Sequence, residues 1–166
     1  MTGVRITITD DELRRAIAGL ARIARDPGPV LEEVGEALLF STTERQRAGR
    51  APDGSPWPAL NPQYRADKSN SEMLRESGRL MGSLSRQVRG RRLRFGTNVE
   101  YAAIHQFGGT IRAKGGGRLA FFLGGQLQRP TEVTIPARPF LGISAEDREE
   151  IVEIFREHAQ RAMGAS

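Results

Sequence analysis

The sequence predicts an α+β fold, in which N-terminal helices and a C-terminal helix pack on a small antiparallel sheet. Apolar residues recur at helical spacing near both ends of the chain, while the middle holds short strand-like segments. Stretches rich in Gly and Pro separate these segments, which is typical of turns and loops. This order of elements favours helices packed on an antiparallel sheet. A chain of 166 residues is the size of one domain, so residues 1–166 are expected to fold as one.

The chain is expected to begin with an extended arm and two helices. Apolar Val4, Ile6 and Ile8 alternate with polar residues, which predicts a strand or extended arm at residues 1–9. Thr9 and Glu12 match a capping box, and the helix that they open ends at the Pro-rich residues 26–29. A second helix is predicted at residues 30–47, with a core-facing stripe of Leu31, Val34, Leu38 and Phe40.

Residues 48–62 are predicted to be an irregular, loop-rich segment that packs little in the isolated subunit. Gly, Pro, Asp and Ser replace the helical pattern there, and Trp57 stands between two prolines. Trp57 is interpreted either as a lid over the helices or as an interface anchor. Two short helices are predicted next, at residues 63–68 and 79–85, with a polar break between them at residues 69–71.

The first strands are predicted shortly after residue 85. Residues 87–89 and 93–95 have the pattern of a hairpin, joined across residues 90–92. In such a hairpin Arg92 and Arg94 share one face, while Leu93 and Phe95 point toward the core. One or two helical turns are expected at residues 101–107, where Gly108 and Gly109 stop them.

The following region, residues 113–131, is expected to be loop-rich, with a strand before it at residues 110–112. Residues 114–117 are predicted to be a flexible loop, and residues 119–123 are expected to pair with residues 132–135. Prolines make residues 135–140 extended. Ser144 and Asp147 then match a capping box that opens the last helix, whose inner side carries Ile151, Ile154, Phe155 and His158.

The charge of the chain is positive and unevenly distributed. The formal net charge is +5, and all but two of the 25 basic residues are arginine. Residues 77–131 hold ten basic residues against the single acid Glu100, a local charge of +9, which leaves −4 for the remainder. The arginines, including Arg86, Arg89, Arg91, Arg92 and Arg94, are open to three interpretations. They could meet an acidic protein surface, such as the Glu149, Glu150 and Glu153 side of a neighbouring copy, or bind nucleic acid, or form a solvated face.

Several classes of function lack support in the sequence. Without cysteine no disulfide or Cys-based zinc site can form, and two histidines, His105 and His158, are too few for a metal cluster. No apolar run approaches the roughly 18 residues that a membrane span needs, so the protein is expected to be soluble and made in a cytosol. Glu100, Tyr101 and His105 form the one neighbourhood with acid-base groups, but their spacing is poor for catalysis. The glycine clusters match no nucleotide-binding motif. Neither enzyme activity nor a cofactor or metal is expected.

Four segments, in this order, resemble the phage virion morphogenesis family, also called phage tail completion. These motif segments are Pro52-Asp53-Gly54-Ser55-Pro56-Trp57-Pro58 with Leu60, then Leu74-Arg75-Glu76-Ser77-Gly78-Arg79-Leu80, then Tyr101-Ala102-Ala103-Ile104-His105-Gln106-Phe107-Gly108-Gly109, and finally Ile135-Pro136-Ala137-Arg138-Pro139-Phe140-Leu141-Gly142. The resemblance implies a non-enzymatic virion protein, assembled in the bacterial host cytoplasm, that completes the tail or joins it to the head and forms rings. Residues 114–132 are unlike the family pattern, so no role is transferred to them.

Seven side chains are candidates for binding partners, meaning other copies of the chain or phage tail and head–tail connector proteins. Nucleic acid is an alternative partner for the arginines, and no membrane partner is expected. Prolines on both sides fix the backbone at Arg138 and Phe140, which predicts either presentation to a partner or a rigid corner that seats Phe140 in the core. His105 and Gln106 are interpreted as part of a fold-defining turn or of an intersubunit contact. The full set is Trp57, Arg92, Arg94, His105, Gln106, Arg138 and Phe140.

Overall fold

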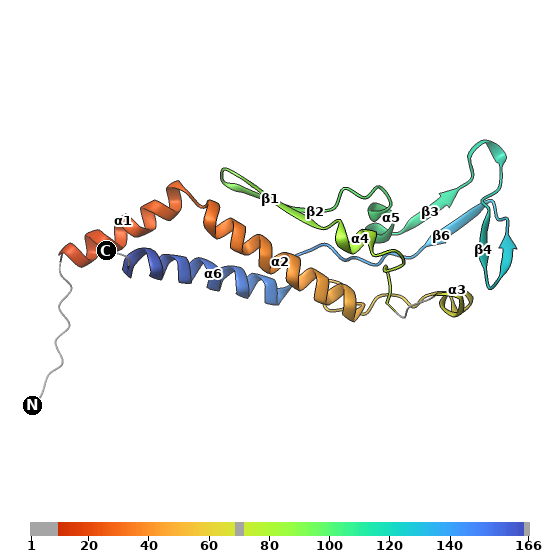
Figure 1. Cartoon of the computed structure of the whole chain (residues 1–166), viewed down its shortest axis with the longest axis horizontal. Coiled ribbons are helices and arrows are strands. Elements are labelled where there is room, and N and C mark those ends of the chain that lie inside the picture. Colours follow the sequence, from red (N-terminus) through yellow and green to blue (C-terminus); the bar gives the residue numbers. More distant parts are fainter. Residues whose placement is uncertain (1–9, 69–71, 165–166) are drawn as a thin grey trace, which may run out of the picture.

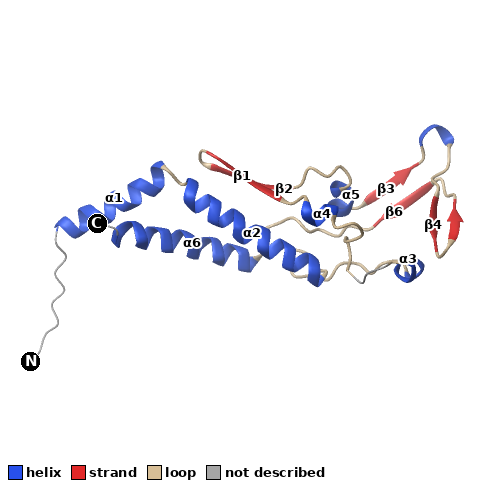
Figure 2. Cartoon of the chain, in the orientation of Figure 1, coloured by secondary structure: helices blue, strands red, loops and turns tan. Residues whose placement is uncertain are grey.

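The computed structural model describes residues 10–68 and 72–164, and it confirms the α+β class. The chain is elongated, with its long helices toward one end and most of its short strands toward the other (Figure 1). Colouring by secondary structure shows the same division (Figure 2). The predicted arm at residues 1–9, Thr9 of the first capping box and the polar break at residues 69–71 lie outside the described residues.

Three long helices form one end of the molecule: α1 (Asp10–Arg25), α2 (Gly28–Ala48) and α6 (Ala145–Gly164). α6 packs on α1 and α2, so it lies against helices and not against a sheet. The predicted capping box opens α6, since the Asp147 amide donates to Ser144 Oγ at 3.1 Å and the Ser144 amide donates to Asp147 Oδ2 at 2.8 Å. Arg45 of α2 then donates to the same Asp147 carboxylate at 2.7 Å, which ties the start of α6 to α2.

The buried stripe of α2 differs from the prediction at Phe40. That side chain is 71% exposed, whereas the stripe continues from Leu38 through the buried polar residues Thr42 and Gln46. Steps of four residues stay on one face of a helix, but Phe40 lies two residues after Leu38 and therefore about 200° away from it. Phe40 was assigned to the buried stripe because it is apolar, but the stripe in the structure continues through polar side chains instead.

The predicted hairpin is present and covers another face of α2. It consists of β1 (Ser85–Arg89) and β2 (Arg92–Gly96), which pair antiparallel with Val88 opposite Leu93. Leu93 and Phe95 pack against the buried cluster that Val30, Val34 and Leu38 of α2 form with Ile154 of α6, as the alternation of the strand predicted. α2 thus contacts both the hairpin and α6 (Figure 1).

The remaining strands pair differently from the prediction. β4 (Phe121–Leu123) pairs with β5 (Gln126–Gln128), while β6 (Glu132–Ile135) pairs with β3 (Gly109–Arg112), so the expected pairing of residues 119–123 with 132–135 is wrong. Gly124 and Gly125 explain the difference, because their φ angles of 62° and 72° suit a two-residue hairpin turn that returns the chain at once. The strands described here make three two-stranded sheets instead of one.

A second buried cluster involves α4 (Arg79–Gly82), α5 (Ala102–Phe107) and the loops around them. Its members are Ala51, Trp57, Leu80, Val99, Ala102 and Phe140. A further short helix, α3 (Pro62–Asp67), contributes no buried residue. Residues 48–62 are largely irregular and most of them are exposed, but Ala51 and Trp57 within this segment are buried. Trp57 is 5% exposed, its backbone amide donates to the carbonyl of Gly49 at 2.8 Å, and its indole donates to the carbonyl of Pro139 at 2.7 Å. The predicted loop at residues 114–117 contains a single 3-10 turn, η1 (Lys114–Gly116).

Candidate partner-binding surfaces

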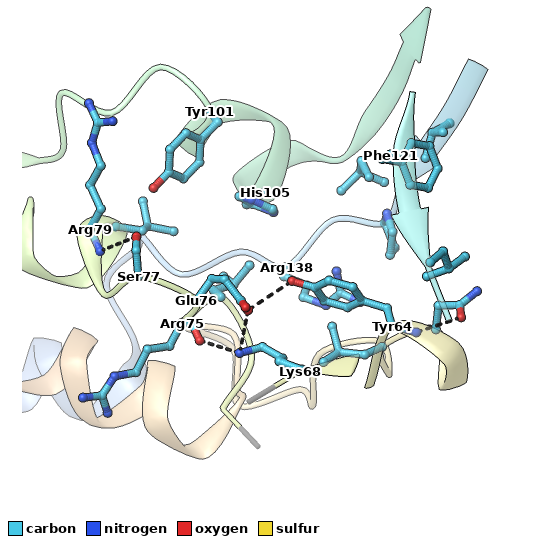
Figure 3. A pocket seen from close by; sticks show the side chains of 18 of the residues that line it. Tyr64, Lys68, Arg75, Glu76, Ser77, Arg79, Tyr101, His105, Phe121 and Arg138 are labelled. Atoms are coloured by element: carbon cyan, nitrogen blue, oxygen red, sulfur yellow. Dashed lines mark hydrogen bonds and ion pairs between the residues drawn. The ribbon is translucent and has the colours of Figure 1, made fainter. Parts of the chain in front are cut away.

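The four motif segments meet in space. Each contributes one residue to the second buried cluster, namely Trp57, Leu80, Ala102 and Phe140. Each also lines a cavity of about 540 Å³, here called the motif cavity (Figure 3). α3, β4 and β6 complete its walls. The side chains that line it are Leu60, Asn61, Tyr64, Lys68, Leu74, Arg75, Glu76, Ser77, Arg79, Leu80, Tyr101, His105, Phe121, Phe122, Leu123, Val133, Thr134, Ile135, Pro136 and Arg138, with Gly78 between them.

The lining of the motif cavity combines apolar walls with excess positive charge. Four cationic side chains line it, but Glu76 is its one carboxylate, so these residues carry a net charge of +3. Lys68 Nζ lies 3.1 Å from Glu76 Oε2 and also donates to the carbonyl of Arg75, while the Tyr64 hydroxyl donates to Glu76 at 3.3 Å (Figure 3). Burial, followed by the neighbouring Glu76 carboxylate, raises the pKa of Tyr64. Lys68 is therefore paired with Glu76, and Arg75 is paired with Glu72, whose carboxylate does not line the cavity. Within the described residues, Arg79 and Arg138 are the lining cations that no ion pair neutralises.

Arg138 supplies a buried positive charge to this cavity. Its side chain is 5% exposed, and its guanidinium donates to the carbonyls of Pro58 and Ala59 at 3.0 Å each. Among residues 10–68 and 72–164, no carboxylate forms an ion pair with it. A buried guanidinium is normally paired with a carboxylate, so Arg138 contributes an uncompensated charge at the cavity wall.

His105 lies beside Arg138 in the cavity wall and has an unsatisfied ring nitrogen. Its Nδ1 is buried without a hydrogen-bond partner in the described part of the chain, and its ring meets Tyr101 edge-on with centroids 5.9 Å apart. Burial, and then the positive charge of Arg138, lowers the pKa of His105, which favours the neutral imidazole. No hydrogen bond joins His105 to Tyr101 or Glu100 within the described ranges, so these three residues form no proton relay.

Three of the other predicted partner-binding side chains are engaged inside the subunit. Phe140 is completely buried and Trp57 nearly so. Gln106 Oε1 accepts from the amides of Phe140 and Leu141 at 3.0 Å each, and Gln106 Nε2 donates to the Leu141 carbonyl at 2.9 Å. Gln106 therefore joins α5 to the segment that carries Phe140, through both ends of its amide group.

Arg92 and Arg94 lie far along the fold from the cavity, on the outer face of the β1–β2 hairpin. Arg89, on β1, and Arg91, in the turn, are exposed with them, and Arg89 is directly opposite Arg92 in the strand register. These four residues are here called the arginine face. In the described parts of the chain none of the four forms an ion pair. Arg86 differs, because it lies on the inner face and pairs with Glu32 and Glu36 of α2.

The predicted side chains therefore lie in two separate regions of the structure. His105 and Arg138 are brought together at the motif cavity, but Arg92 and Arg94 are not near them. No sequence pattern pointed to Tyr64 of α3, to Lys68 just after α3, or to Phe121 and Leu123 of β4, all of which line the cavity. In the structure half-buried Phe121 and Leu123 alternate with exposed Phe122. All three residues are apolar, so the sequence itself carries no alternation that could have shown which face of the strand is turned inward.

The described residues contain neither a candidate metal site nor a candidate membrane span. No group of three or more His, Asp and Glu side chains is placed to hold a metal ion there. None of the helices in residues 10–68 and 72–164 combines the length and the apolar character that crossing a membrane requires.

Comparison with known proteins gives a family and one relative. Residues 8–160 match the phage virion morphogenesis family. The chain is similar to the Mu-like prophage FluMu G protein 2 of Haemophilus influenzae, with 27% identity over 149 residues that cover 90% of each chain. No solved structure matches.

Proposed function

Because this chain belongs to the phage virion morphogenesis family, a non-enzymatic structural family, we propose that it completes the phage tail or joins the tail to the head through protein–protein contacts. The observation that carries this proposal is the convergence of all four motif segments on the motif cavity. Those segments lie far apart in the sequence, and their meeting point offers a concave surface of the size that proteins use for binding.

The chemistry of the motif cavity favours an acidic protein segment with apolar side chains. Arg79 and the buried guanidinium of Arg138, which form no ion pair within the described residues, attract a carboxylate, while Leu74, Phe121 and Leu123 offer apolar contacts. A neighbouring tail or head–tail connector protein is the partner that fits the family, and the site of action is the virion, at the tail or the head–tail junction.

The proposal also includes self-association, with the protein acting as a ring of identical subunits after synthesis in the bacterial host cytoplasm. A ring at the end of a tail presents many copies of the motif cavity to its neighbours at once. Multiple weak contacts then combine into a stable junction.

Complementation of a phage that lacks this gene tests the proposal. Without the gene, electron micrographs of lysates should show heads and tails that are not joined, and plating should be lost. The variant Phe121→Glu places a carboxylate in the cavity wall, so it should fold normally but fail to restore joining. Leu127→Glu is the matched control, because Leu127 is exposed on the same hairpin and does not line the cavity.

Two results would overturn the proposal. Joined, infectious particles in the absence of the gene would show that the protein does not complete the particle. Equal plating of the two variants would show that the motif cavity is not the contact surface. Circular dichroism and solution mass of both variants separate these outcomes from simple misfolding.

A further inference from the structure

We propose that the arginine face of one subunit binds an acidic groove between α2 and α6 of the next copy, so that identical chains associate head to tail. This inference rests on the proposed function, because it specifies the surfaces through which the proposed ring forms. It concerns a surface away from the motif cavity, which is left free for other virion proteins.

The arginine face has a surplus of charge that the subunit itself does not neutralise. Arg89, Arg91, Arg92 and Arg94 are exposed, and no ion pair within the described residues involves them. Arg89 and Arg92 are directly opposite each other in the ladder, where like charges destabilise a hairpin. The inner face of the same hairpin behaves differently, since Arg86 is neutralised by two glutamates of α2. Carboxylates from a partner would relieve the repulsion on the outer face.

The complementary surface lies on the helical layer. A groove of about 500 Å³ runs between α2 and α6, and its lining residues are Glu36, Ala37, Leu38, Phe40, Ser41, Glu146, Asp147, Glu150 and Ile151. Asp147 is already paired with Arg45, but Glu146 and Glu150 are exposed, and Glu149 is exposed beside them. In the described chain none of these three glutamates forms an ion pair. They are here called the acidic face.

Phe40 gives this groove an apolar anchor as well as charge. It is 71% exposed, although it sits on a helix whose other faces are covered by the hairpin and by α6. An arginine of the partner can bind this groove in two ways at once. Its guanidinium can stack on the ring of Phe40 and donate hydrogen bonds to the nearby carboxylates. The need for both contacts explains why arginine is used here and not lysine. It also gives exposed Phe40 a role, which this side chain lacks in the isolated subunit.

The positions of the two surfaces favour a head-to-tail contact. The hairpin packs on one face of α2 and α6 packs on another, so one subunit can hold two neighbours at the same time (Figure 1). Contacts between two different surfaces of identical chains generate closed rings when the rotation between copies closes. The same contacts are sensitive to salt, because both faces are exposed.

Charge reversal with reciprocal rescue tests the contact. The variants Arg92→Glu with Arg94→Glu, and Glu149→Arg with Glu150→Arg, should each weaken self-association by about tenfold or more, measured by light scattering at several salt concentrations. A chain that carries all four substitutions has complementary faces again, so its mass should return toward that of the wild type. Arg65→Glu with Arg129→Glu changes net charge by the same amount on exposed sites elsewhere, and it should leave the mass unchanged.

Each other outcome overturns the inference. A wild-type protein that stays monomeric at low salt and high concentration excludes self-association through these faces. Failure of the fourfold variant to regain mass excludes the acidic face as the partner of the arginines. Loss of a salt-sensitive gel shift with duplex DNA, with mass unchanged in the Arg92→Glu, Arg94→Glu variant, assigns the arginine face to nucleic acid. Failed complementation by Phe121→Glu at normal mass is not one of these outcomes, because it reports a defect of the motif cavity and leaves the self-contact intact.

Discussion

Replacing Gln106 by leucine should destabilise the subunit strongly, although the residue lies in a short helix near the surface. Leucine has a similar size but cannot accept from the amides of Phe140 and Leu141 or donate to the Leu141 carbonyl. Each hydrogen bond contributes roughly 1 kcal/mol net, and a buried amide left without an acceptor costs more. The loss of all three therefore predicts a decrease of about 3 kcal/mol in the free energy of unfolding.

For a chain of this length, about 3 kcal/mol corresponds to a decrease of roughly 6–12 °C in Tm. Urea unfolding followed by circular dichroism, together with a thermal scan, measures both quantities. Gln126→Leu is the matched control, because Gln126 is exposed in β5, and its effect should stay within about 0.5 kcal/mol. If Gln106→Leu were as stable as the control while phage assembly failed, the residue would act on a partner, and the structural role assigned to it here would be refuted.

Three further predictions concern the same end of the molecule. Gly108→Ala should lower the free energy of unfolding by about 1–3 kcal/mol or more, because φ is 69° and an added Cβ would lie 2.7 Å from the Ala137 amide nitrogen. Gly115 also has a positive φ, 62°, but an added Cβ would meet open space there. Gly115→Ala should therefore cost less in the same urea assay. Burial, and then the charge of Arg138, lower the pKa of His105 in the folded chain. As pH falls below 6.5, the unfolded chain therefore binds a proton at His105 that the folded chain does not yet bind. Stability should therefore decrease on acidification more steeply than in His105→Gln, and parallel urea curves would contradict this. The Trp57 amide should exchange hydrogen slowly, and the exposed Gly115 amide rapidly, in the isolated subunit.

Local sequence patterns predicted the long elements well. The second and last helices and the β1–β2 hairpin depend on periodicity, capping residues and strand alternation, all of which are properties of neighbours in sequence. The capping box of Ser144 and Asp147 is an example, because both hydrogen bonds are made within four residues. Likewise, Leu93 and Phe95 could be assigned to the inner face from alternation alone.

Features that depend on distant contacts could not be predicted in the same way. The partner of β6 is β3 and not β4, and only the two-glycine turn at Gly124 and Gly125 hinted at a separate hairpin. The prolines beside Arg138 and Phe140 fix the local backbone, but they do not determine whether a side chain points outward or into the core. The motif cavity belongs to this second class, because α3 and β4 reach it only through tertiary packing.

The separation of the motif cavity from the arginine and acidic faces has a genetic consequence. Both faces of the proposed self-contact are encoded by one gene, so they are inherited together and can change together. The proposed partner of the cavity is a different protein encoded by another gene, and recombination between phages can separate the two genes. A hybrid phage that receives a distant version of this gene should then still form its rings, while joining fails until the cavity and its partner match again.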